Sequence, residues 1–354
     1  MSFICPISQQ FTDTAFKQQR LKAWQPILTP KTVLPTLFII GIIFAPIGGL
    51  LIWGSSLVTE ITFDYTDCEK LTPSTEEASL TFVNMPSNKY SYSLSAKDEK
   101  NAKPNTPRYA FLDNTNNSTI TNVSDKKQCV VEFDIPADLS ATVLLYYKLT
   151  NFYQNHRRYV KSLDTNQLKG KGVSASTLEN GDCKPLATIN GTAIYPCGLI
   201  ANSLFNGLSL QAPQQFIVID LLMPDTFSIL TLLNPSDSST SSETYTFSSN
   251  GIAWPGEAKK YATTPIGPGG YANLSYIVPP PNWRLRYPDG YTDNNPPPDL
   301  KADEHFQNWM RTAGLPTFTK LYGRNDVDKM QKGTYRIIIG LSKFQTFLPK
   351  YSMC

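Results

Sequence analysis

Residues 32–59 of this chain contain no charged side chain, which few folds can accommodate. A helix rises about 1.5 Å per residue, so roughly 20 residues cross the ~30 Å hydrocarbon core of a membrane. We therefore predict a transmembrane helix over residues 32–57. The alternatives are a buried core helix and a cleaved signal peptide, whose apolar part usually spans only roughly 7 to 15 residues. Here the apolar run extends from about Val33 to Trp53.

The predicted span is rich in small and helix-bending residues, namely Gly41, Pro46, Gly48 and Gly49. Glycine and proline weaken a helix in water, but they are more frequent in membrane helices. Small side chains also allow two membrane helices to approach closely. These four positions are therefore predicted to contact a helix of a partner.

The charged residues on either side of the span predict its orientation. Before it, four basic residues stand against a single acid, Asp13, and after it four acids precede the first base, Lys70. Basic flanks tend to stay in the cytosol. We therefore expect residues 1–31 to form a cytosolic tail and residues 58–339 to form a lumenal or extracellular domain.

That large domain is predicted to be mainly β. Short runs rich in β-branched and aromatic residues, at 141–149, 215–223 and 334–339, are typical of strands, and connections rich in proline or serine separate them. The pattern favours an antiparallel β-sandwich with long loops and a few short helices. The predicted fold class is therefore a membrane protein with one N-terminal helix and a β-rich domain.

One helix is expected late in this domain. Asp303 can cap it, and Phe306, Trp309 and Met310 then share one face. We interpret that face as core, with a docking surface as the alternative.

Four cysteines fall on the side that is predicted to be oxidising, with Cys354 left over: Cys68, Cys129, Cys183 and Cys197. Three pairings are possible. We favour Cys183 with Cys197, because a short loop is the easiest to close, which leaves Cys68 with Cys129. Buried free thiols are the alternative.

Five asparagines begin an N-x-S/T triplet on the same side of the membrane: Asn116, Asn117, Asn122, Asn190 and Asn273. Chance alone gives a few such triplets in a chain of this length. Their shared location agrees with the predicted orientation, and we expect N-glycosylation at these sites.

The sequence contains none of the catalytic motifs H-E-x-x-H, G-x-S-x-G or the phosphate-binding G-x-x-x-x-G-K-[ST], so we expect neither an enzyme nor a cofactor or metal site. A basic cluster at His156, Arg157 and Arg158, with Lys161 nearby, could bind lipid headgroups or an acidic partner surface. The alternative is a solvated or internally paired loop.

Several long sequence blocks are more specific than these general patterns: "FKQQRLKAWQPILTP", "LTNFYQNHRRYVKS", "PCGLIANSLFN", "GIAWPGEAKKY", "PPPNW" and "WMRTAGLPTFTKLYGRND". Together, from about Ala15 to Ile339, they closely resemble the ligand-effect modulator (cell-division-control protein fifty) family. Members of that family are accessory β subunits of type-IV P-type ATPases, which are phospholipid flippases.

The resemblance implies a non-catalytic subunit that joins the ATPase as a heterodimer in the endoplasmic reticulum and supports its folding, its export and lipid flipping towards the cytosolic leaflet. It also implies a glycosylated β-sandwich, membrane lipids as neighbours, no nucleic acid, and residence in the endoplasmic reticulum, Golgi, endosomes or plasma membrane. The alternative function is a stand-alone cell-surface receptor that binds glycans or lipids.

The chain departs from the family near its end. Family members have a second membrane helix there, whereas "GTYRIII" is followed here by "GLSKFQTFLPKYSMC", in which no run could span a bilayer. We therefore expect residues 340–354 to be a divergent tail in a truncated form, with weaker assembly.

Overall fold

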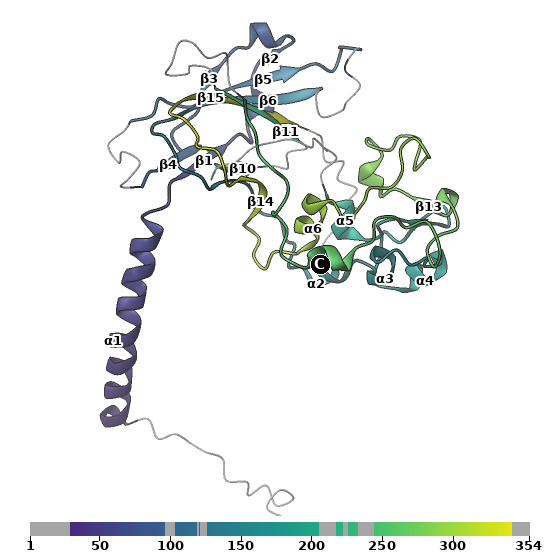
Figure 1. Cartoon of the computed structure of the whole chain (residues 1–354), viewed down its shortest axis with the longest axis horizontal. Coiled ribbons are helices and arrows are strands. Elements are labelled where there is room, and N and C mark those ends of the chain that lie inside the picture. Colours follow the sequence, from purple (N-terminus) through teal and green to yellow (C-terminus); the bar gives the residue numbers. More distant parts are fainter. Residues whose placement is uncertain are drawn as a thin grey trace, which may run out of the picture. The chain divides into compact units, whose positions relative to one another are not determined.

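The computed structural model describes residues 29–95, 103–118, 120, 126–204, 217–221, 226–232 and 244–341. The chain forms two compact units that are separated in sequence between Ser55 and Ser56 (Figure 1). Three predicted features lie outside the described residues, namely the tail before residue 29, the sequon asparagine Asn122 and the segment after residue 341.

Helix α1 (Pro30–Ser55) is the described part of the first unit. Its Val33–Ser55 segment has a mean hydropathy of 2.3 and is the one helix within the described ranges that is long and apolar enough to cross a membrane. Large apolar side chains cover opposite sides of it, with Ile42 71% and Leu51 69% exposed. A helix without a polar face favours an apolar environment, so α1 is a candidate membrane span.

The second unit contains a five-stranded sheet and a seven-stranded sheet (Figure 1). The five-stranded sheet has the order β14 (Phe318–Asn325), β7 (Val143–Leu149), β10 (Ile217–Leu221), β1 (Glu60–Asp64) and β4 (Tyr90–Ser93). The larger sheet has the order β12 (Thr244–Tyr245), β11 (Thr226–Leu232), β15 (Gly333–Gly340), β6 (Lys127–Ile135), β5 (Arg108–Asp113) and β2 (Pro73–Ser74), with β3 (Val83–Asn84) also paired to β5.

The two sheets pack face to face through alternate side chains of their strands. Along β7, buried and half-buried residues alternate, as expected for a strand with one face in the core. The rings of Phe63 on β1 and Phe133 on β6 lie 4.8 Å apart, centroid to centroid, and Tyr335 on β15 extends the contact. The molecule therefore has the sandwich core that its strand pattern predicts.

Most strand pairs are antiparallel, but β10 is parallel to both β1 and β7, and β2 is parallel to β5. The expected antiparallel arrangement does not extend to these pairs. Residue alternation could not reveal the difference, because successive side chains point to opposite faces in both kinds of strand.

Two disulfides cross-link this unit. Cys68, in the single-turn helix η1 (Cys68–Lys70), is bonded to Cys129 on β6 with a Cα–Cα distance of 6.1 Å. This bond connects the segment that follows β1 to the opposite sheet. Cys183 is bonded to Cys197, with 5.7 Å between their Cα atoms.

Residues 150–204 and 246–316 form a part with little regular structure, which we call the loop-rich lobe (Figure 1). Its α-helices are short: α2 (Arg157–Lys161), α3 (Thr165–Leu168), α4 (Ala175–Asn180), α5 (Leu199–Asn202) and α6 (Glu304–Met310). A small sheet joins β8 (Thr188–Ile189), β9 (Thr192–Ile194) and β13 (Ile277–Val278). Single-turn helices are η2 (Glu77–Ser79) in the sandwich and, in the lobe, η4 (Glu257–Lys260), η5 (Leu274–Tyr276) and η6 (Pro281–Trp283).

Helix α6 begins where the sequence predicts. The Asp303 carboxylate accepts a hydrogen bond from the Phe306 backbone N–H at 2.9 Å, which satisfies one of the first donors of the helix. Phe306 and Trp309 are fully buried and Met310 is 8% exposed. The apolar face of this helix is therefore part of the core.

Lys320 holds the other end of α6. Its buried Nζ donates to the carbonyl oxygens of Asn308, Trp309 and Arg311. Burial lowers the pKa of Lys320 to about 7, whereas three carbonyl acceptors at a helix C-terminus favour the ammonium form. The contact fixes where the helix ends and the 311–316 loop begins.

A buried carboxylate sets the register of three strands in the seven-stranded sheet. Glu132 on β6 lies opposite Arg108 on β5 and Arg336 on β15. The Glu132 carboxylate is 2.6 Å from a terminal guanidinium nitrogen of each arginine. Both guanidinium groups also lie over the ring of Phe82, at 5.3 and 5.5 Å from its centroid. Only 4% of the Glu132 side chain is exposed.

Replacing Glu132 by leucine should destabilise the protein, because two arginines would lose their common acceptor inside the sheet. We expect a loss of about 3 kcal/mol, which is at the low end for a broken buried ion pair because the arginines remain partly exposed. The measurement is thermal unfolding of the purified full-length protein in detergent. Lys70→Ala, which removes an ion pair to Asp67 from a lysine side chain that is 79% exposed, is the control. Equally small losses in the two variants would contradict this role of Glu132.

Candidate functional site

Within the described ranges, no three histidine, cysteine, aspartate or glutamate side chains lie close enough together to hold a metal ion. His156 is exposed at the start of α2. His305 belongs to α6, and its ring centroid lies 4.5 Å from that of Tyr322. Apart from the four cysteines, the predicted site residues lie on α1, near α2 and in the sequons.

The small residues of α1 do not all share one face. Successive helical residues turn by about 100°, so Gly48 lies about 20° and Ala45 about 40° from Gly41, whereas Gly49 lies about 80° and Pro46 about 140° away. Gly41, Ala45 and Gly48 thus form one line along the helix, Gly49 borders it, and Pro46 belongs to another face.

This line of small residues is open. A Cβ atom added at Gly41 or Gly48 would have no neighbouring atom within 4 Å. The N-terminal half of the line lies in a shallow apolar groove formed by Leu34, Leu37, Phe38, Gly41, Ile42 and Ala45. A helix that carries such a groove can accept the ridge of another membrane helix.

The basic cluster lies on α2 in the loop-rich lobe. His156, Arg157, Arg158 and Lys161 are all exposed. Among the described residues, no ion pair joins any of these four side chains to a carboxylate. The positive charges of the two arginines and the lysine are therefore directed to solvent.

The opposite side of α2 is anchored in the lobe by Tyr159. Its hydroxyl lies 2.7 Å from Ser203 Oγ and receives a long hydrogen bond from Gln154 Nε2. Burial raises the pKa of Tyr159 to about 12, so the hydroxyl stays protonated at neutral pH. The ring also contacts Phe152 edge-on. Helix α2 is thus held in one orientation, with its basic residues outwards.

The loop before α2 is joined to the 311–316 loop by three hydrogen bonds. Phe152 N–H donates to the Pro316 carbonyl, the Ala313 N–H donates to Gln154, and Asn155 donates to the Gly314 carbonyl. These bonds place two exposed apolar side chains, Tyr153 and Leu315, on the joined loops beside the basic cluster. We call Tyr153, His156, Arg157, Arg158 and Leu315 the α2 surface.

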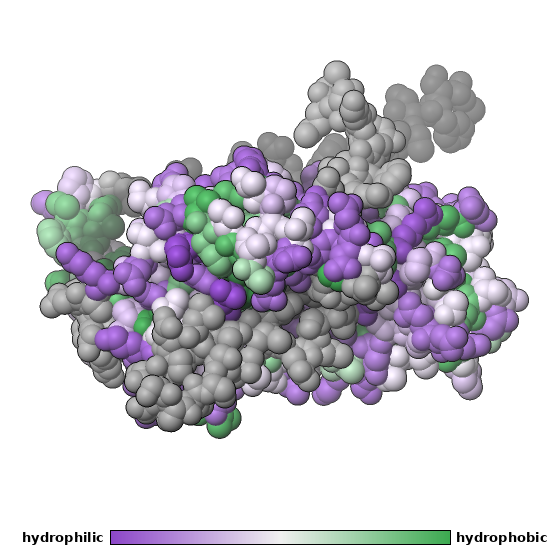
Figure 2. All heavy atoms as spheres, turned by 90° about the horizontal axis from the view of Figure 1, so that it is seen from above, coloured by the Kyte–Doolittle hydropathy of each residue, from purple (hydrophilic) through white to green (hydrophobic). Residues whose placement is uncertain are grey.

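Sequence reasoning identified the basic part of the α2 surface but missed Tyr153 and Leu315. It also missed Trp254, which is 61% exposed and has the Arg311 guanidinium 3.8 Å from its ring centroid. All three lie in the sequence blocks that carry the family resemblance. That resemblance was the signal in the sequence that could have pointed to them. Large apolar residues are usually buried, so composition gives no reason to expect them outside. Figure 2 shows that hydrophobic areas interrupt the hydrophilic surface on the face in view.

Four of those sequence blocks meet around α5. Trp309 Nε1 donates to the Ile200 carbonyl at 2.8 Å, and the Asn282 N–H donates to Asn202 Oδ1 at 3.0 Å. Phe152 packs against Trp309 with 5.7 Å between ring centroids. The residues that carry the resemblance therefore build one connected interior beneath the α2 surface.

Four of the five sequon asparagines are described, and all four are exposed. Asn116 and Asn117 lie in the turn after β5, Asn190 lies in the turn between β8 and β9, and Asn273 precedes η5. Asn122 lies outside the described residues. Each described site leaves the asparagine accessible to a modifying enzyme.

Comparison with known proteins identifies the family. The model of the LEM3 (ligand-effect modulator 3) family / CDC50 family matches residues 51–347. A Chaetomium thermophilum protein named phospholipid-transporting ATPase accessory subunit CDC50 is 40% identical over 332 residues, which cover 92% of this chain and 74% of that protein. Phospholipid-transporting ATPase accessory subunit CRF1 of Saccharomyces cerevisiae is 38% identical over 328 residues, or 93% and 71% of the two chains. Cell cycle control protein 50A of Mus musculus is 34% identical over 315 residues, or 88% and 68%. The chain therefore belongs to the CDC50/LEM3 family.

Proposed function

We propose that this chain is a non-catalytic accessory subunit of a phospholipid-transporting P-type ATPase, with which it forms a heterodimer. The observation that carries this proposal is the similarity over 92% of the chain to a protein named as such an accessory subunit. In this proposal the ATPase carries out ATP hydrolysis. The chain described here supports its folding, its exit from the endoplasmic reticulum and lipid movement towards the cytosolic leaflet.

The proposed orientation places the N-terminus in the cytosol and the β-rich unit in the lumen or outside the cell. The charge difference across the apolar helix supports it. The two disulfides are compatible with it, because such bonds persist in oxidising compartments. Accessible asparagines in the N-x-S/T triplets also agree with residence in the secretory pathway.

Two surfaces are proposed to contact the ATPase. In the membrane, the line of Gly41, Ala45 and Gly48 would receive a helix of the ATPase, because small side chains let the two backbones approach. Outside the membrane, the α2 surface would bind an acidic segment of the ATPase, with Tyr153 and Leu315 as apolar contacts and Arg157 and Arg158 as charged ones. Arginine suits this role because its planar group binds carboxylates in a bidentate manner.

A tagged version of this chain, produced in cells that lack their own accessory subunit, should copurify with a P-type ATPase and restore uptake of a fluorescent phospholipid. Without the subunit, the ATPase should be retained in the endoplasmic reticulum. Correct membrane insertion of the chain without recovery of an ATPase would contradict the proposal. Such a result would favour a stand-alone glycan- or lipid-binding receptor.

The double variant Gly41→Leu and Gly48→Leu should weaken ATPase recovery about tenfold, which corresponds to about 1.4 kcal/mol of binding free energy. The added side chains would hold two helices apart. Gly54→Leu is a matched control, because its added side chain is equally unobstructed and lies about 220° around the helix from Gly41. If the double variant is recovered with as much ATPase as the control, this face is not the contact.

The double variant Arg157→Glu and Arg158→Glu should also reduce ATPase recovery, and more so at low ionic strength, because exposed charges interact more strongly when salt is scarce. Lys329→Glu with Lys332→Glu makes the same change of charge at two other exposed lysines and should leave recovery unchanged. Coprecipitation at low and high salt is the measurement. A similar loss in both double variants would show a general effect of charge and exclude a specific α2 contact.

A further inference from the structure

Two of the sequons lie at the same edge of the small sheet in the loop-rich lobe. Strands β9 and β13 are parallel, with Ala193 paired to Ile277 and Ile194 paired to Val278. The triplet of Asn190 ends at Thr192, the first residue of β9, and the triplet of Asn273 ends two residues before β13. Because parallel strands begin at the same edge, both attachment sites lie there.

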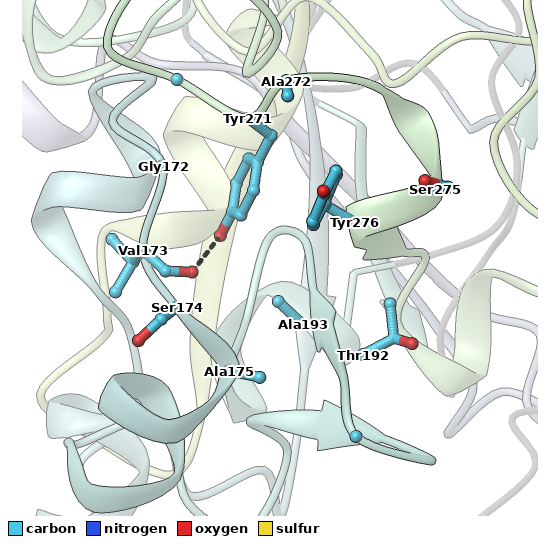
Figure 3. A pocket seen from close by; sticks show the side chains of 12 residues that line it. Gly172, Val173, Ser174, Ala175, Thr192, Ala193, Tyr271, Ala272, Ser275 and Tyr276 are labelled. Atoms are coloured by element: carbon cyan, nitrogen blue, oxygen red, sulfur yellow. Dashed lines mark hydrogen bonds between the residues drawn. The ribbon is translucent and has the colours of Figure 1, made fainter.

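A pocket of about 330 Å³ lies at this edge (Figure 3). Its volume is at the lower end of the roughly 300 to 1,000 Å³ that is typical of small-molecule sites. Thr192 and Ser275, the hydroxyl residues of the two triplets, both line it. The recognition sequences of two modification sites thus form part of one pocket.

The floor of the pocket is closely packed. A Cβ atom at Gly172 would lie 2.5 Å from the Gly270 carbonyl oxygen, so two backbone segments meet there without room for a side chain. Tyr271 fixes one wall, because its hydroxyl donates to the Val173 carbonyl and accepts from Gln167 Nε2, both at 3.0 Å. Figure 3 shows the first of these bonds. The cavity is therefore preformed.

The other wall carries an exposed aromatic ring. Tyr276 is 58% exposed, and its ring lies between Tyr271 and Ser275 in Figure 3. Ser174 and Thr192 add hydroxyl groups to the lining. An open aromatic face with a few nearby hydroxyl groups suits a sugar ring, which presents an apolar C–H face and hydrogen-bonding groups at its edge.

Asn273 lies on the rim of this pocket, because residues on both sides of it in the chain line the cavity. Its Oδ1 accepts from the backbone N–H and the hydroxyl of Ser275. Those contacts leave Nδ2, the atom to which an N-glycan is attached, available. Asn190 has lining residues on one side only, at Gly191 and Thr192.

We propose that this pocket holds the first N-acetylglucosamine residues of a glycan attached to Asn273, with Tyr276 as the stacking surface. The inference rests on the proposed lumenal or extracellular orientation of the β-rich unit. Isolated sugars bind proteins weakly, but a short covalent tether gives an effective concentration of about millimolar. A weak site at the point of attachment can therefore be filled, and it would join the 172–175 and 271–276 segments through the sugar.

The test uses an endoglycosidase that cleaves between the two core N-acetylglucosamines. The native full-length protein is digested, and glycopeptide mass spectrometry follows each site. If the pocket is occupied about nine-tenths of the time, cleavage at Asn273 should be about tenfold slower than at Asn116 or Asn117, and equal after denaturation. Equal rates in the native protein would overturn the proposal, and this measurement requires no variant.

Tyr276→Ala should raise the native cleavage rate at Asn273 to that at Asn116. Tyr153→Ala is the matched control, because Tyr153 is also 58% exposed but does not line the pocket, and it should leave the rate unchanged. An unmodified Asn273 in protein whose other sequons are modified would refute the pocket proposal and leave the orientation intact. A chain without any glycan would refute both, whereas ATPase copurification tests the accessory role separately.

Discussion

The loop-rich lobe depends on side chains that satisfy buried peptide groups. Few of its residues belong to the hydrogen-bond ladders between strands, so its buried peptide groups need other partners. A buried N–H or C=O left without a partner costs about 1–3 kcal/mol. Gln167, which is fully buried, donates to the Ile194 carbonyl and accepts from the Cys197 N–H. Trp309 and Lys320 act similarly at α5 and at the end of α6. These contacts replace the backbone hydrogen bonds that a sheet would provide.

The same constraint gives the lobe its defined outer surface. Gln154 is fully buried, and by accepting from the Ala313 N–H it joins the loop before α2 to the loop after α6. Tyr153 and Leu315 are thereby presented from a fixed backbone. A surface that is already ordered loses less conformational entropy when it binds, so more of the contact energy contributes to affinity. Side-chain contacts in the interior thus prepare the exposed residues for a partner.

The sequence predicts elements whose signal is local. The uncharged run gives α1, the apolar and aromatic run at 141–149 gives β7, and Asp303 marks the start of α6. It does not predict that β10 is parallel to its neighbours, because pairing depends on segments far apart in the chain. For the same reason the sequence predicts the basic residues of the α2 surface but not its apolar ones. The position of Leu315 depends on a contact between two loops that are about 160 residues apart in the chain. Local patterns carry no information about such contacts.

The pairing of β6 with β15 has a consequence for synthesis. Glu132 and its partner Arg336 are 204 residues apart. At a translation rate of about 5–20 residues per second, β6 waits roughly 10 to 40 s for that strand. During that time its edge is open to pairing with other chains, a known route to aggregation. Cys68 and Cys129 both precede this interval, so their bond can hold the early strands while the later ones are being made. Protection of this edge by a chaperone would therefore favour correct folding until β15 has been made.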